Sequence, residues 1–324
     1  MRKISLFASF AIVAVVVIAA CNKHSADKQA ATEPETPALQ RQCASYDVLQ
    51  QQLMADPSLA SRMEAIEQFT RNFEKNPAAY RLLPDGTMEI PVVFNVLYKT
   101  TAQNVSLAQL QSQIDVLNED YAATNADYNL TSTYNSVKSG NTGIKFVLDV
   151  VNRRSTTKTS WTTNDAMKKS TQGIAPTSPT TKLNIWVCNL SGGILGYAQF
   201  PGGSSATDGV VLDDNATGRT GTAAAPFNKG RTATHEIGHW LNLRHIWGDA
   251  TCGNDLVGDT PLHDAANFGC PAAGHKSTCT GTPVEMTMNY MDYTDDACMY
   301  MFSAGQKTRM QATYALGGPR ASFR

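Results

Sequence analysis

The eleven residues HEIGHWLNLRH, from His235 to His245, restrict the fold of this chain more than any other segment. His235 and His239 are four residues apart, and on a helix such side chains lie about 40° apart, so both rings can reach one metal ion. His245 comes ten residues after His235, which is about 15 Å along a continuous helix. It reaches the same ion only if the helix ends near Asn242 and the chain turns back. Such a turn needs a positive φ, and asparagine is the usual second choice after glycine there.

Glu236 adds a carboxylate beside the expected ion. Three neutral imidazoles leave the fourth position of zinc open for a water, whose pKa zinc lowers to about 7. Glu236 can take a proton from that water, so the segment predicts a hydrolytic zinc site with Glu236 as the general base. A site of two histidines and one glutamate would need a glutamate on a later helix. Glu285 is the only glutamate after Glu236 and stands in a loop-like stretch, so we favour three histidine ligands.

A second motif, MNYMDYTDDACMYMF, follows at 288–302. Together the two motifs resemble the zinc-binding consensus and Met-turn of the metzincin metallopeptidases, and they are most similar to the pappalysin family. The segments GYAQFPGG, DLVGDTP and FSAGQKTRM are also similar to that family. The resemblance covers roughly 88–315 and implies an α+β fold. We therefore expect a twisted, mixed five-stranded sheet with two main helices, and an irregular C-terminal subdomain stapled by disulfides.

The resemblance also implies roles for three residues of the second motif. Met291 would be the Met-turn residue beneath the metal, and Tyr293 would stabilise the oxyanion by a phenol hydrogen bond. Asp296 would lie at the base of the S1′ pocket and pair with an arginine or lysine side chain of the substrate, which predicts a preference for Arg or Lys at P1′. The alternatives are a core aromatic for Tyr293 and a solvated surface acid for Asp296.

Four of the seven cysteines lie downstream of the histidines. The residues alone leave three pairings open. The spacing of the family implies the crossed disulfides Cys252–Cys279 and Cys270–Cys298, which would staple loops that have no core of their own.

The segment DLVGDTP supplies oxygen donors of the kind that calcium prefers. Members of the family carry structural calcium near this point. The resemblance therefore implies calcium as a second cofactor beside zinc, with Asp255, Asp259 and Thr260 as its candidate ligands.

The N-terminus predicts export. A short basic stretch precedes an apolar run that ends in VIAAC, which resembles the lipobox of bacterial lipoproteins and makes Cys21 the lipidated residue. A transmembrane anchor and an ordinary cleaved signal are the alternatives. We expect a signal peptide over 1–20, a tether and propeptide over 21–80, and a catalytic domain over 81–324. The protein would be anchored to a membrane by its lipid, with release of a secreted mature enzyme left open.

Cys43 lies upstream of the expected catalytic domain and suggests how the enzyme stays latent. A thiolate binds zinc strongly, so Cys43 would take the position of the water in a zymogen. The alternative is a disulfide between Cys43 and Cys188. Cys188 stands in the apolar strand NIWVCNL, where a buried free thiol is common.

The rest of the chain fits such a domain. Apolar periodicity predicts helices over 44–75, interrupted near Pro57, and over 106–123 with Ser106 as N-cap, and strands over 89–98, 143–151, 182–190 and 208–214. A net charge of -1 with 17% charged residues gives no sign of a nucleic-acid partner.

We expect a zinc endopeptidase that acts on proteins or peptides, which would lie extended and pair with an edge strand. The rival hypothesis is a catalytically silent surface-binding lipoprotein, which would not need Glu236.

Overall fold

The computed structural model describes residues 39–77 and 87–323. The expected signal peptide, the lipidation site Cys21 and the boundary near Arg81 lie outside these residues. All that follows concerns the compact unit from Leu39 onward. Within its described part, no helix has the length and apolar character that a membrane span requires.

The centre of this unit is a mixed five-stranded sheet in the order β2-β1-β3-β5-β4. Four strands run parallel, and only the short edge strand β4 runs antiparallel, paired with β5. The parallel strands agree with the four predicted ones to within a few residues, while β4 was not predicted as a strand. The strand bounds are β1 Met88–Tyr98, β2 Ile144–Ser155, β3 Leu183–Cys188, β4 Gly196–Ala198 and β5 Val210–Asp213.

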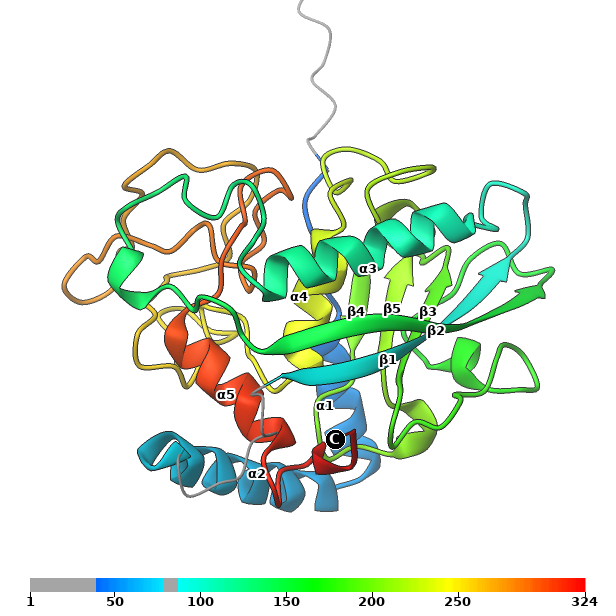
Figure 1. Cartoon of the computed structure of the whole chain (residues 1–324), viewed down its shortest axis with the longest axis horizontal. Coiled ribbons are helices and arrows are strands. Elements are labelled where there is room, and N and C mark those ends of the chain that lie inside the picture. The colour runs from blue at the N-terminus through cyan, green and yellow to red at the C-terminus, as the bar shows by residue number, and fades with distance from the viewer. Residues whose placement is uncertain (1–38, 78–86, 324) are drawn as a thin grey trace, which may run out of the picture. The chain divides into compact units, whose positions relative to one another are not determined.

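Two helices pack on the sheet, as expected. Helix α3 (Leu107–Tyr121) begins at the predicted N-cap, where the Ser106 hydroxyl accepts a hydrogen bond from the Gln109 amide at 3.1 Å. Its apolar residues join those of α4 (Arg231–Trp240) and of the strands in one buried core. Figure 1 shows α3 lying across the sheet, with α4 close to it. Because α4 is anchored in this way, its histidines are held on a rigid element.

The segment after α4 has little regular structure until α5 (Ala304–Tyr314). Both expected disulfides are present, Cys252–Cys279 and Cys270–Cys298. Helix α5 begins with a capping box between Ser303 and Gln306. The fold class predicted from the sequence is therefore confirmed, including the irregular C-terminal half.

The N-terminal residues of this unit pack against the rest of it. Helices α1 (Ser45–Ala55) and α2 (Ser58–Lys75) meet at Pro57, as predicted, and α2 lies against α5 (Figure 1). The polar composition of residues 22–42 predicts a flexible tether, but Arg41 is already buried, with 1% of its surface exposed. Cys43 and Cys188 are both free, so the alternative disulfide between them is not formed.

Candidate metal centre

Three histidine rings converge at the end of α4. The Nε2 atom of His239 lies 3.2 Å from that of His235 and 3.1 Å from that of His245. All three side chains are buried. Three buried ring nitrogens this close form a set of donors that fits a zinc ion.

The outer nitrogen of each ring has an acceptor. The Nδ1 atoms of His235 and His239 contact the carbonyl oxygens of Tyr290 and Leu243 at 2.7 and 2.8 Å, and that of His245 contacts the Asp249 carboxylate. Such partners place the proton on Nδ1 and leave Nε2 free for a metal. Burial, followed by the neighbouring His245, lowers the pKa of His239 to about 3, so this ring is neutral. Sequence reasoning missed Asp249, although its spacing of four residues from His245 was a signal.

Asn242 makes the turn that brings His245 back. Its φ is 71°, the left-handed conformation that the sequence predicted. The amide of Leu243 closes the end of the helix by donating to the carbonyl of Gly238 at 2.9 Å. The side-chain Nδ2 of Asn242 is buried and has no hydrogen-bond partner among the described residues. The backbone conformation of Asn242, rather than a contact of its side chain, therefore produces the turn.

Met291 lies directly against α4. A Cβ atom at Gly238 would come within 2.4 Å of the Met291 Sδ, so only glycine allows this approach. Met291 is fully buried, and the adjacent Tyr290 carbonyl is the one that holds His235. Met291 and the Tyr290 carbonyl therefore both lie against the helix that carries His235 and His239, and the Met-turn role of Met291 stays a prediction.

The N-terminal segment reaches the same point. The Cys43 Sγ joins the three histidine nitrogens in a group whose members all lie within 4.8 Å of one another. The thiol also lies 3.2 Å from the Glu236 Oε2, which accepts a second hydrogen bond from the Ser45 hydroxyl at 2.8 Å. Burial and the charge of Glu236 both raise the pKa of the Cys43 thiol. A thiolate here therefore needs a cation beside it, such as a metal ion held by the three histidine nitrogens.

Tyr293 faces this centre rather than the core. Its hydroxyl donates to the Cys43 carbonyl at 3.0 Å, and its ring contacts those of His235 and His245. The phenol thus binds a peptide carbonyl beside the histidines, and its role in stabilising an oxyanion stays a prediction.

Asp296 is fully buried, so it is not a surface acid. Its Oδ1 accepts a hydrogen bond from Arg41 at 2.6 Å, and its Oδ2 accepts one from the backbone amide of Lys229 at 2.7 Å. The guanidinium of Arg41 also lies over the ring of Phe227, 5.0 Å from its centre. An arginine two residues before Cys43 thus occupies the position beside Asp296. Sequence reasoning missed Arg41 because the surrounding composition resembles a tether.

The candidate calcium ligands do not form one cluster. Asp255 accepts hydrogen bonds from the Thr260 hydroxyl at 3.1 and 2.9 Å, whereas Asp259 caps the start of α5 at Ser303 and Gly305. Calcium binding stays a prediction. Glu285 is hydrogen-bonded to Asn267 and is not a member of the group formed by the histidines.

This fold and site define a class of proteins, the metzincin-type metallopeptidases. The family model described as pregnancy-associated plasma protein-A matches residues 178–315. An extracellular metalloprotease of Verticillium alfalfae is 35% identical over 242 residues, which are 72% of this chain and 79% of that protein. An extracellular metalloprotease of Pyricularia oryzae is also 35% identical, over 66% of this chain and 70% of that protein. The chain belongs to the pappalysin family of metalloproteases.

Two solved structures from Tannerella forsythia are similar over most of the chain. The match to a mutant of promirolysin covers 87% of this chain and 97% of the promirolysin chain, with 40% identity and a TM-score of 0.79. Mature mirolysin in complex with a cleaved peptide covers 73% of this chain and 95% of its own, with 43% identity and a TM-score of 0.70. The proform matches a larger part of this chain than the mature form does.

Proposed function

We propose that this metalloprotease is a zinc endopeptidase that is exported and made as a zymogen. Its zinc ligands would be His235, His239 and His245. The convergence of their Nε2 atoms with the Cys43 sulfur beside Glu236 is the observation that carries this proposal. The likeness to promirolysin supports a latent form.

Zinc held by the three histidines would lower the pKa of a water and polarise the substrate carbonyl. Glu236 then accepts the proton of the attacking water and passes it to the leaving amine. Tyr293 donates a hydrogen bond to the carbonyl oxygen as negative charge develops there, and its present bond to the Cys43 carbonyl is a model for that contact.

In the zymogen, the N-terminal segment occupies the positions that a substrate needs. Residues 42–44 pair with the edge of the sheet through hydrogen bonds from Ala44 N to Gly196 O and from Leu195 N to Gln42 O. Cys43 would hold zinc together with the three histidines, while Ser45 binds the general base Glu236. A substrate would add to the same edge once this segment has left.

The contact between Arg41 and Asp296 supports a preference for Arg or Lys at P1′. A buried carboxylate that already holds a guanidinium at 2.6 Å is suited to a basic side chain of the substrate. We also retain the lipid anchor at Cys21 and structural calcium as parts of the proposal, with Asp255 and Thr260, which contact each other, as the candidate calcium ligands.

Peptide cleavage tests the catalytic proposal. Residues 22–324 are incubated with a peptide library, with and without a chelator, beside the Glu236→Ala variant. We expect cleavage before Arg or Lys, and loss of turnover with the chelator and in Glu236→Ala. Turnover by Glu236→Ala would overturn the mechanism. Cuts without preference on the primed side would overturn only the role of Asp296.

A pair of cysteine variants tests latency. Cys43→Ala should speed self-activation, because it removes the sulfur that lies with the three histidine nitrogens. Cys188→Ala is the matched control, since Cys188 is the other free thiol of the described residues and is buried in β3. Equal activation rates for wild type and Cys43→Ala would contradict the thiol switch.

A further inference from the structure

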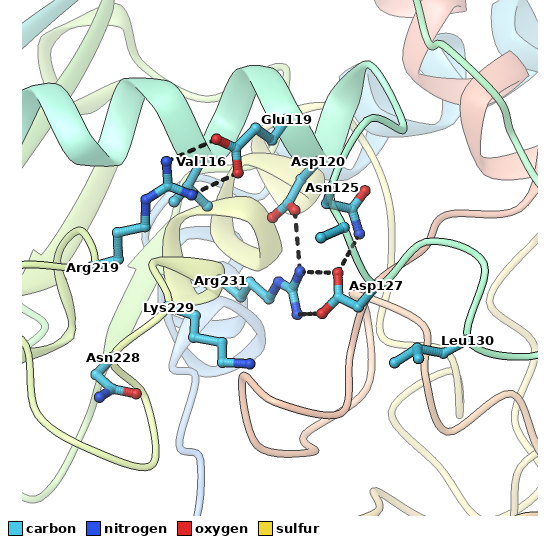
Figure 2. Close-up of a pocket in the computed structure, with 11 residues that line it drawn as sticks. Val116, Glu119, Asp120, Asn125, Asp127, Leu130, Arg219, Asn228, Lys229 and Arg231 are labelled. Atoms are coloured by element: carbon cyan, nitrogen blue, oxygen red, sulfur yellow. Dashed lines mark hydrogen bonds and ion pairs between the residues drawn. The ribbon is translucent and has the colours of Figure 1, made fainter.

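A second pocket lies behind Asp296. It has a volume of about 550 Å³ and is lined by the end of α3, the loop that follows it, and residues 228–231 at the start of α4 (Figure 2). Its walls carry three acidic and three basic side chains: Glu119, Asp120, Asp127, Arg219, Lys229 and Arg231. Lys229 is also the residue whose backbone amide binds Asp296.

The two arginines of this pocket are paired differently. Arg219 binds Glu119 at 2.6 and 2.8 Å, and both side chains are 39% exposed. Arg231 is 6% exposed and donates to both carboxylate oxygens of Asp127 at 2.6 Å. The Asp120 carboxylate is 3.6 Å from Arg231 on another side. Figure 2 shows the guanidinium of Arg231 between these two carboxylates.

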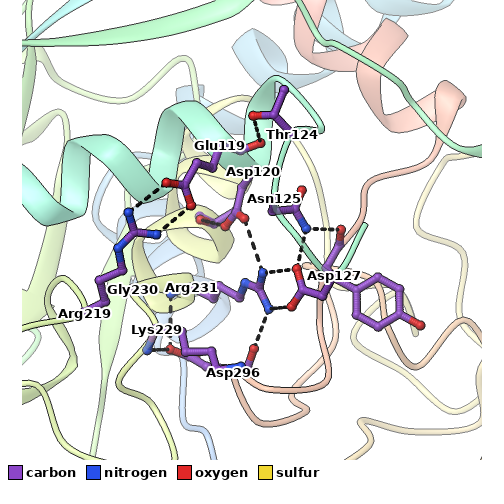
Figure 3. A network of polar contacts seen from close by, with 12 residues as sticks. Glu119, Asp120, Thr124, Asn125, Asp127, Arg219, Lys229, Gly230, Arg231 and Asp296 are labelled. Carbon is purple, nitrogen blue, oxygen red and sulfur yellow. Dashed lines mark hydrogen bonds and ion pairs between the residues drawn. The ribbon is translucent and has the colours of Figure 1, made fainter. Parts of the chain in front are cut away.

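Arg231 also holds Asp296 at two points (Figure 3). Its backbone amide lies 3.3 Å from the Asp296 Oδ2, and its NH1 donates to the Asp296 carbonyl oxygen at 2.7 Å. Lys229 binds the same Oδ2. The other carboxylate oxygen of Asp296, Oδ1, therefore faces Arg41. Arg41 marks the position that a basic side chain of the substrate would take.

This arrangement places a second guanidinium next to Asp296. An unbalanced positive charge on Arg231 would repel a substrate arginine and compete for the carboxylate of Asp296, because charges interact strongly at buried sites. Asp127 and Asp120 supply the balancing negative charge. The negative charge of Asp296 is thereby left for the substrate.

We propose that Asp127, acting through Arg231, is a positioning residue that orients Asp296 and reserves its charge for a basic P1′ side chain. The proposal deepens the function proposed above and rests on its Arg/Lys preference. Asp127 has no hydrogen bond to Asp296 among the contacts of the described residues, so its effect passes through the guanidinium group of Arg231.

The test compares two peptides that differ only at P1′, one with arginine and one with norleucine. The activated enzyme is assayed as wild type, Asp127→Asn and Asp127→Glu. In Asp127→Asn the ratio of kcat/KM for arginine over norleucine should fall about tenfold, which is less than the loss expected for a direct partner of a buried charge pair, because Asp127 acts through Arg231. The loss should appear as a higher KM for the arginine peptide with little change for norleucine. Asp127→Glu should recover part of the ratio.

Glu119→Gln is the matched control. It removes one negative charge from the same pocket, but its partner Arg219 has no contact with Asp296, so the ratio should stay within about twofold of wild type. If Asp127→Asn does not fold, Arg231→Lys is tested instead. A lysine has a single nitrogen in place of the guanidinium that binds both Asp127 oxygens and the Asp296 carbonyl.

A wild-type enzyme without arginine preference would refute the proposed specificity itself. A wild type that prefers arginine, with the same ratio in Asp127→Asn or Arg231→Lys, would overturn the positioning role alone. An equal fall in Glu119→Gln would also overturn it, because the effect would then come from the overall charge of the pocket.

Discussion

Asn242 determines, at the scale of a single residue, whether the third histidine reaches the metal. Its left-handed backbone ends α4 after His239 and returns the chain toward His245. An L-residue in this conformation is strained by its Cβ, and the side-chain Nδ2 of Asn242 is also buried with no hydrogen-bond partner in the described part of the chain. The side chain therefore adds two costs that glycine would not have.

Asn242→Gly should stabilise the zinc-loaded protein by about 0.5–1 kcal/mol, or roughly 1–3 °C in Tm. Thermal unfolding of the two proteins at equal zinc concentration measures the difference. Asn242→Ala is the control, and it should be destabilised because alanine has the Cβ without asparagine's tolerance of positive φ. A lower Tm for Asn242→Gly would mean that the asparagine side chain contributes a stabilising contact.

Helix α2 anchors the N-terminal segment at the scale of an element. Glu67 accepts hydrogen bonds from Arg309 of α5 at 2.9 and 2.8 Å, and Arg309 is 1% exposed. Phe73 is fully buried on the same helix. Glu64 is instead exposed and pairs with Arg71 within α2. The latent form is thus held at α5 as well as at the metal centre.

Glu67→Gln should weaken this anchor and speed self-activation roughly tenfold, because it leaves a buried guanidinium with a neutral partner. The fraction of processed chain is followed by gel electrophoresis after zinc is added. Glu64→Gln changes the same charge on the exposed face and should activate at the wild-type rate. Equal rates for all three proteins would show that α2 does not limit activation.

At the scale of the whole molecule, local sequence patterns predicted helices, strands and the histidine cluster, but not the contacts between distant segments. The spacing of His235, His239 and His245 and the turn at Asn242 follow from the geometry of a helix and its end. The contact of Arg41 with Asp296 joins residues 255 positions apart, and no local pattern reveals it. The edge strand β4 has only three residues, which is too short for an alternating apolar pattern to reveal it. The role of Arg231 likewise depends on α3, α4 and the Met-turn segment packing together.

Three contacts hold the N-terminal segment in place in the proposed latent form. Arg41 binds Asp296, Cys43 lies beside the three histidines, and Glu67 binds α5 at Arg309. We propose that Cys43 is a ligand of zinc in this form.

X-ray absorption at the zinc edge tests that claim most directly. The sample is the Glu236→Ala protein, residues 22–324, which cannot process itself. We expect three nitrogen ligands and one sulfur at about 2.3 Å, and only nitrogen and oxygen ligands after a further Cys43→Ser change. A zinc site without sulfur in the unprocessed chain that retains Cys43 would contradict the account.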